Sequence, residues 1–223
     1  MSEESTGEPQ SGASLMREAY FQTYIFFRDL VDGTTMNEAM LPEIYAWREQ
    51  DRAGIHRSNV RQAGAWHSGV DMHLRPPFAP LRDAVLEMSA DIFRTLHYDP
   101  ATEPRLDNMW ANISPRHAFN RVHIHPNTLW SGVYYVQTPE NCGRIYFTDP
   151  RMQALMLTPM FDPDTERRSE SWSEVYYEPV AGRLLMFPSW LMHEVEPNMS
   201  DASGVDGDRI SVSFNVFQVR TTP

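Results

Sequence analysis

The clearest strand in the sequence is the segment Asp208-Arg209-Ile210-Ser211-Val212-Ser213-Phe214-Asn215-Val216. Apolar and polar side chains alternate along it, and successive side chains of a strand point to opposite faces. One face is therefore apolar and suited to a core, and the other face is polar. The pattern predicts a strand over 208–218.

The same period of two runs through the whole C-terminal half of the chain. Before it, helical spacing predicts helices over 35–52 and 80–96, and aromatic or β-branched runs predict strands at 19–28 and 64–74. Two helices followed by about eight short strands favour a mainly β fold with flanking helices and a double-stranded β-helix core, the jelly roll of cupin-like proteins. Turn residues separate the remaining predicted strands, which cover 106–113, 119–125, 130–137, 143–148, 173–178, 182–187 and 190–196.

The length of 223 residues fits one domain with additions. Residues 1–14 are rich in Ser, Glu, Gly and Pro and are expected to be a disordered tail. A single domain is then expected to span 15–223, with supporting helices and strands in 15–105 and the jelly-roll core in 106–223. A polar stretch at 149–171 is too long for a hairpin turn and is expected to be a binding loop or lid.

All 19 basic residues are arginine, and the sequence contains no lysine. Schiff-base chemistry and the standard P-loop are therefore excluded, because both need a lysine amine. Any anion must be bound by arginine, histidine or backbone N–H groups. Arginine binds carboxylates in a planar, bidentate manner.

The remaining composition limits the class of partner. The formal net charge of −11 disfavours nucleic acid as a partner. No apolar run approaches the roughly 20 residues that span a bilayer, and the acidic N-terminus does not look like a secretory signal. The single Cys142 permits no internal disulfide. We therefore expect a cytoplasmic protein with no membrane partner; its oligomeric state is not readable from the sequence.

Three histidines are candidate metal ligands. In Arg121-Val122-His123-Ile124-His125, strand alternation puts His123 and His125 on one face, together with Arg121. His193 follows the buried run and proline turn Gly182 to Pro188, on a strand that a jelly roll returns to the same mouth. Three imidazoles from two distant strands form a facial set for a divalent transition metal. The alternative is that the histidines only make ordinary hydrogen bonds.

Arg209 and Ser211 are candidates for binding a carboxylate. They lie two residues apart on one predicted strand face, so a guanidinium fork and a hydroxyl can bind the same group. Taken alone, the strand is equally consistent with a sheet edge that has one face in water.

Several motifs in this order resemble the Fe(II)- and 2-oxoglutarate-dependent oxygenases. The resemblance covers about residues 60–218 and is strongest to a bacterial and phage group of that superfamily. The matching segments are Asn120-Arg121-Val122-His123-Ile124-His125-Pro126-Asn127, Ser-Gly-Val-Tyr-Tyr at 131–135, Gly-Arg-Ile-Tyr-Phe at 143–147, Phe187-Pro188-Ser189-Trp190-Leu191-Met192-His193 and Arg209-Ile210-Ser211-Val212-Ser213-Phe214-Asn215.

The resemblance implies an activity and a set of roles. Fe(II) on His123, His125 and His193 would use O2 and 2-oxoglutarate to hydroxylate a small molecule, with release of succinate and CO2. Arg209 and Ser211 would hold the distal carboxylate of 2-oxoglutarate, with Tyr135 as a further contact. The weaker substrate candidates are Arg121, Asn108, Trp110 and His67.

The sequence departs from the superfamily at one ligand. His125 stands where an Asp or Glu is usual, so either His125 is not a ligand or the metal works without 2-oxoglutarate. Two other functions therefore stay open. One is a cupin-type three-histidine metalloenzyme that does not use 2-oxoglutarate, and the other is a non-enzymatic jelly-roll binding protein.

Overall fold

The computed structural model describes residues 15–58, 63–157 and 159–221, that is, the chain without 1–14, 59–62, 158 and 222–223. The predicted tail at 1–14 lies outside the described residues. The helices are α1 (Gly33–Gln50), α2 (Gly54–Arg57) and α3 (Ala79–Thr95). The strands are β1 (Phe26–Asp29), β2 (Trp66–His67), β3 (Thr102–Ser114), β4 (Asn120–His123), β5 (Trp130–Gln137), β6 (Ile145–Thr148), β7 (Glu174–Tyr177), β8 (Arg183–Pro188), β9 (His193–Val195) and β10 (Arg209–Arg220).

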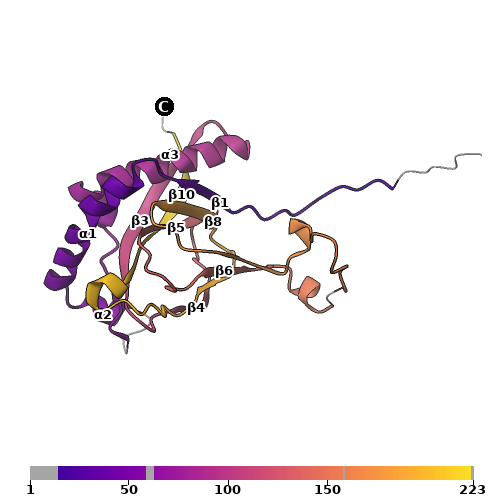
Figure 1. Cartoon of the computed structure of the whole chain (residues 1–223). Coiled ribbons are helices and arrows are strands. Elements are labelled where there is room, and N and C mark those ends of the chain that lie inside the picture. The colour runs from indigo at the N-terminus through magenta and orange to yellow at the C-terminus, as the bar shows by residue number, and fades with distance from the viewer. Residues whose placement is uncertain (1–14, 59–62, 158, 222–223) are drawn as a thin grey trace, which may run out of the picture.

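The strands form two antiparallel sheets. The larger sheet has the order β1-β8-β5-β10-β3-β2, and the smaller one has the order β4-β9-β6-β7. Strand β10, whose alternation is the strongest signal in the sequence, lies between β5 and β3 at the centre of the larger sheet. Figure 1 shows the smaller sheet on one side of the larger sheet and helices α1 and α3 on the other. The predicted mainly β fold with flanking helices is confirmed.

The two long helices cover the outer face of the larger sheet because each presents an apolar stripe. In α1 the buried residues recur at spacings of three and four from Asn37 through Met40 and Ile44 to Trp47. In α3 the buried stripe runs from Leu81 to Phe93. These stripes pack on the apolar face of β10 and its neighbours and form one core.

A second core lies between the two sheets. Val133 and Tyr135 of β5 and Phe187 of β8 pack there against Ile145 and Phe147 of β6. Strands β5 and β8 are therefore buried on both faces, which explains why their sequences read as almost continuous apolar runs. This inter-sheet core fills only part of the space, and the polar face of β10 looks into the rest.

Three sequence predictions for the periphery need correction. Only Phe26–Asp29 of the predicted strand 19–28 pairs with a neighbour, and Tyr20 and Phe21 before it are exposed. Only Trp66–His67 of 64–74 is a strand, because 3-10 turns follow it. The predicted strand 190–196 begins only at His193.

The segment between β6 and β7 contains two short 3-10 helices, Met152–Leu155 and Ser169–Ser171. It projects from the body of the molecule in Figure 1, which agrees with the prediction of a long connection rather than a hairpin turn. Among the described residues, no helix is both long and apolar enough to cross a membrane.

Gly132 in β5 tests how tightly the larger sheet packs on its cores. A Cβ atom at this position would overlap the ring of Phe214 and the carbonyl oxygen of Leu185. We expect Gly132→Ala to lower the free energy of unfolding by about 2–3 kcal/mol, because overpacking forces backbone shifts. Chemical denaturation of the purified variant measures this.

Gly69→Ala is the matched control. The nearest atom to its added Cβ is a carboxylate oxygen of Asp71, at 2.7 Å, which can rotate away. We expect a change within about 0.5 kcal/mol, as for other surface substitutions. Equal losses in the two variants would contradict the packing argument.

Candidate metal centre

The pairing of β4 with β9 places His123 beside His193. Asn120 lies opposite Val195 and His123 opposite His193, so β4 has one more residue than β9 between these pairs. Such a β-bulge re-aims the side chains on its strand. His125 follows the end of β4, and its backbone N–H still donates to the carbonyl oxygen of Ser189 at 2.9 Å.

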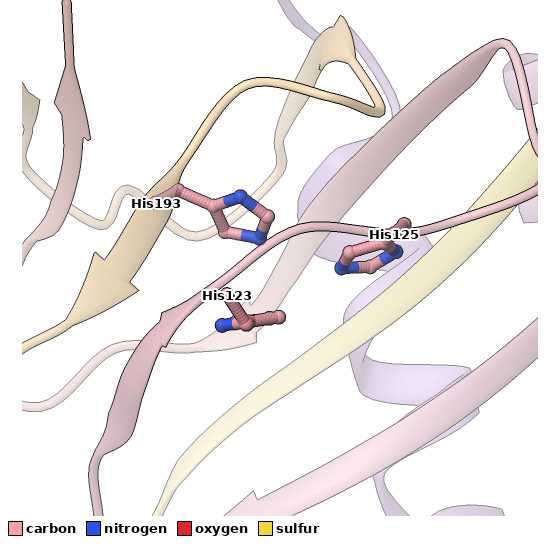
Figure 2. A group of neighbouring side chains, drawn as sticks. All are labelled: His123, His125 and His193. Carbon is pink, nitrogen blue, oxygen red and sulfur yellow. The ribbon is translucent and has the colours of Figure 1, made fainter. Parts of the chain in front are cut away.

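The three imidazoles converge on one point. One nitrogen from each of His123, His125 and His193 lies within 4.8 Å of the others. Figure 2 shows the three rings turned toward a common space from β4, the loop after β4 and β9. The sequence prediction that two distant segments bring these histidines together is therefore matched by the geometry.

Hydrogen bonds at Nδ1 determine which nitrogen of each ring is free. Nδ1 of His123 lies 2.7 Å from the carbonyl oxygen of Arg121, and Nδ1 of His193 lies 2.9 Å from that of Leu191. Nδ1 of His125 lies 2.7 Å from the amide oxygen of Asn215. These oxygens only accept, so Nδ1 carries a proton in all three rings, and the neutral form of each ring has its lone pair at Nε2.

Burial keeps at least two of these rings neutral. Removal from water lowers the pKa of His193 to about 3, and the neighbouring His123 acts in the same direction. Burial also lowers the pKa of His125. A metal competes with protons for histidine, so neutral rings with a bare Nε2 are ready ligands. The donor set fits a divalent first-row transition metal, for which imidazole is a common ligand.

A cavity of about 330 Å³ extends from the histidines into the space between the sheets. This volume lies within the range of small-molecule sites, about 300–1,000 Å³. The three histidines and the predicted carboxylate-binding residues Arg209, Ser211 and Tyr135 all line it. The structure thus brings together the two groups of residues that the sequence analysis singled out separately.

Arg209 is almost completely buried, with 2% of its surface exposed. Its Nη1 donates to the backbone carbonyl oxygens of Cys142 and of Glu196 (3.1 Å), and its Nη2 lies 3.5 Å from that of Ala118. Burial lowers the pKa of the guanidinium, but arginine stays charged in proteins. Carbonyl dipoles therefore hold a permanent cation at the cavity wall.

Ser211 and Tyr135 lie opposite each other in the pairing of β10 with β5. In the part of the chain that the structure describes, no side chain or backbone group hydrogen-bonds either hydroxyl. Burial raises the pKa of Tyr135, so its hydroxyl is neutral and can donate. By contrast, Tyr134 points to the other face of β5, where its hydroxyl donates to Asn37 of α1 at 2.8 Å.

The weaker substrate candidates divide into two groups. His67 and Trp110 line the cavity, with their rings stacked at 5.4 Å. Arg121 and Asn108 do not line it. The expectation that Arg121 shares a face with the histidines is wrong, because the bulge in β4 leaves its side chain exposed.

Some cavity residues were not proposed from the sequence. Asn120 lines the cavity, and Asn215 both lines it and contacts His125. The signal for Asn215 was present, since it shares the polar face of β10 with Arg209 and Ser211. Its contact with a histidine 90 positions away in the chain was not readable without the sheet pairing.

A mainly β jelly roll that turns three imidazoles into one cavity is the arrangement of mononuclear non-haem metal sites. Residues 108–215 match the model of a protein family described as "Putative 2OG-Fe(II) oxygenase". The matched range contains the three histidines as well as Arg209 and Ser211. This match bears out the predicted enzyme class, the Fe(II)- and 2-oxoglutarate-dependent oxygenases.

Solved structures agree with this fold. A prolyl-4-hydroxylase from Pseudomonas putida superposes with a TM-score of 0.55 at 17% identity, covering 86% of this chain and 91% of that one. HygX from Streptomyces hygroscopicus, solved with nickel and 2-oxoglutarate, gives a TM-score of 0.52 at 12% identity and coverage of 87% and 83%.

A viral collagen prolyl hydroxylase from Paramecium Bursaria Chlorella virus-1, solved as a 2-oxoglutarate complex, gives a TM-score of 0.51 at 11% identity and coverage of 90% and 97%. At these identities the likeness concerns the fold, and it confirms the predicted double-stranded β-helix core. No curated protein sequence matches the chain.

The burial of Arg209 leads to a prediction about stability. Arg209→Ala leaves several backbone carbonyl oxygens without their donor, so we expect a loss of about 3 kcal/mol in the free energy of unfolding. Chemical denaturation without metal or ligand measures it. Arg183→Ala is the control, because Arg183 pairs with the exposed Asp29; its loss should stay below about 1 kcal/mol. Equal losses would mean that the carbonyl contacts of Arg209 contribute little.

Proposed function

We propose that His123, His125 and His193 hold Fe(II) and that Arg209, Ser211 and Tyr135 hold the distal carboxylate of 2-oxoglutarate. The enzyme then oxidises a small molecule with O2, by hydroxylation as the default outcome, and converts 2-oxoglutarate to succinate and CO2. The observation that carries this proposal is a single cavity among the described residues that is lined by three converging imidazoles, two unbonded hydroxyls and one buried guanidinium.

Electrostatics supports the placement of 2-oxoglutarate. Among the described residues that line the cavity, Arg209 alone carries a formal charge. The chain as a whole has a net charge of −11, so a dianion needs a local cation to enter. Arg209 supplies that charge. Its Nη1 is bonded to backbone carbonyl oxygens, which leaves Nε and Nη2 as the pair of donors for a carboxylate. The hydroxyls of Ser211 and Tyr135 add neutral donors.

The bound iron would supply the activation of O2, and the protein residues have simpler roles. The Nδ1 hydrogen bonds hold the three rings so that Nε2 faces the metal. The apolar wall of Val133, Ile145 and Phe187 excludes water from the space between the metal and Arg209. Arg209 orients the co-substrate by its far carboxylate, which leaves the near end free to meet the metal.

The remaining wall of the cavity is where we place the substrate. This wall is formed by His67, Trp110, Asn112 and Asn120, and none of these side chains carries a permanent charge. Burial lowers the pKa of His67, so this ring is neutral at neutral pH. Arg121 lies outside the cavity, so this wall offers the substrate no charged side chain. We propose a small molecule as the substrate and no role for nucleic acid or membrane.

Anaerobic spectroscopy tests the proposed chemistry. We expect that addition of Fe(II) and then 2-oxoglutarate to the metal-free protein produces a visible metal-to-ligand charge-transfer band. Admission of O2 should then yield succinate. His193→Ala should lose both signals, because it removes a buried ligand.

The control is to add Fe(II) alone and 2-oxoglutarate alone, because the charge-transfer band should appear only when both are present. Bound iron without the band or succinate would contradict the proposal and favour a three-histidine enzyme that does not use 2-oxoglutarate. That alternative has one specific observation in its support, the histidine at 125 in place of a carboxylate.

Ser211→Ala tests the carboxylate clamp without disturbing the carbonyl contacts of Arg209. Loss of a hydroxyl that bonds a charged group costs about 1.5 kcal/mol, so we expect 2-oxoglutarate to bind about tenfold more weakly. Iron affinity should not change. Titration of the charge-transfer band with 2-oxoglutarate gives the first value, and titration with Fe(II) at saturating 2-oxoglutarate gives the second.

Ser213→Ala makes the same substitution two residues along the same face, where the hydroxyl accepts a bond from Asn112 at 3.1 Å. We expect 2-oxoglutarate to bind this variant as tightly as the unmodified protein. An equal loss in both variants would contradict the assignment of Ser211 to the clamp.

A further inference from the structure

The three candidate ligands differ in what holds them. His123 and His193 each donate from Nδ1 to the backbone carbonyl two residues earlier, at Arg121 and Leu191. These bonds are made within the local backbone and do not depend on any side chain. His125 donates instead to the side chain of Asn215, on a distant strand.

We propose that Asn215 is the positioning residue that makes His125 a metal ligand. The inference rests on the proposed function, because it assigns a role at the same metal centre. His125 is the ligand that stands in place of a carboxylate, and it lies beyond the end of β4, so strand pairing does not fix its ring. The single bond from its Nδ1 to the Asn215 amide oxygen selects the ring's tautomer.

The hydrogen bonds around Asn215 allow its amide only one orientation. Its Oδ1 also accepts from the hydroxyl of Ser131 at 2.7 Å, and its Nδ2 donates to Oδ1 of Asn108 at 2.7 Å. Asn108 decides the orientation, because its own Nδ2 donates to Asp107 at 2.8 Å and its Oδ1 therefore faces Asn215. A flipped Asn215 amide would place its oxygen against this acceptor. The oxygen therefore faces His125, whose Nδ1 must carry the proton and whose Nε2 must be bare.

Ring packing alone does not select the tautomer of His125. Trp110 stacks on His125 with ring centroids 6.0 Å apart, and His67 also stacks on Trp110, at 5.4 Å. Stacking restrains the plane of a ring but does not distinguish Nδ1 from Nε2. Asn108 lies outside the cavity and acts through Asn215, which gives it a place in the site different from the direct substrate contact expected from the sequence.

The same strand face connects the metal centre to the co-substrate clamp. Asn215, Ser211 and Arg209 all project from one face of β10 into the cavity. The central strand β10 thus fixes His125 and the carboxylate clamp relative to each other. A metal and a co-substrate bound there would be held at a fixed separation.

Metal titration of matched variants tests the proposal. We expect Asn215→Leu to bind Ni(II) about 10–100-fold more weakly than the unmodified protein, the usual effect of losing a partner to a ligating histidine. Asn112→Leu is the control, because it makes the same substitution at a cavity residue whose amide bonds Ser213 and no histidine. Equal affinities for Asn215→Leu and the unmodified protein, or equal losses in the two variants, would overturn the proposal.

Two further variants show whether Asn215 acts through His125. Asn215→Asp keeps an oxygen acceptor, so Ni(II) should bind within about threefold of the unmodified protein or more tightly. In a His125→Ala background, adding Asn215→Leu should change affinity by less than about twofold, because the residue it serves is gone. A full loss in that background would overturn the proposal.

The tautomer of His125 can be measured without any variant. In the full-length, metal-free protein labelled with ¹⁵N at histidine, long-range ¹H–¹⁵N spectra should show His125 protonated at Nδ1. Protonation at Nε2 would overturn the proposal even if Asn215→Leu failed to fold. If the unmodified protein binds no metal while His125 is protonated at Nδ1, the proposed function fails and the orienting bond from Asn215 stands.

Discussion

The buried guanidinium of Arg209 is the interaction on which the arrangement of the two sheets depends. Arg209 is the first residue of β10, and it donates to carbonyl oxygens before β4, before β6 and after β9, three of the four strands of the smaller sheet. A charge buried this deeply is tolerated only when it is hydrogen-bonded. The same contacts therefore join the sheets at one end of the cavity and keep a cation there. In a chain without lysine, no other residue type provides a permanent charge with this many donors.

The other end of the cavity depends on backbone geometry. The bulge in β4 turns His123 inward beside His193 and turns Arg121 and Val122 out into solvent. Two of the three rings then find their Nδ1 acceptors in carbonyls two residues away. Such bonds form with no help from other side chains. The third ring is different because His125 has left the strand, and it relies on Asn215 for the acceptor. Backbone carbonyls therefore orient two of the candidate ligands, and a side-chain amide orients the third.

Much of this site could be read from the sequence because it lies on strands with strict alternation. Arg209 and Ser211 were placed on one face by period alone, and Tyr135 faces the cavity while Tyr134 bonds α1. The failures have physical causes. Arg121 was misplaced because a bulge adds one residue, and period-two reasoning then reverses every later assignment. The stretch 19–28 has strand composition, but only its last residues find a partner strand. The contact between Asn215 and His125 depends on how distant strands pack, which no local pattern encodes.

The histidine at 125 also changes the charge at the proposed centre. A carboxylate there would lower the charge of a divalent metal site by one unit, whereas a neutral imidazole leaves it unchanged. A divalent metal and the cation of Arg209 together outweigh a bound 2-oxoglutarate dianion, so the cavity keeps a net positive charge. No carboxylate among the described cavity residues offsets it. Attraction to an anion is strongest where water is excluded. The three-histidine set is therefore compatible with 2-oxoglutarate, since it strengthens the attraction that Arg209 exerts in an otherwise acidic protein.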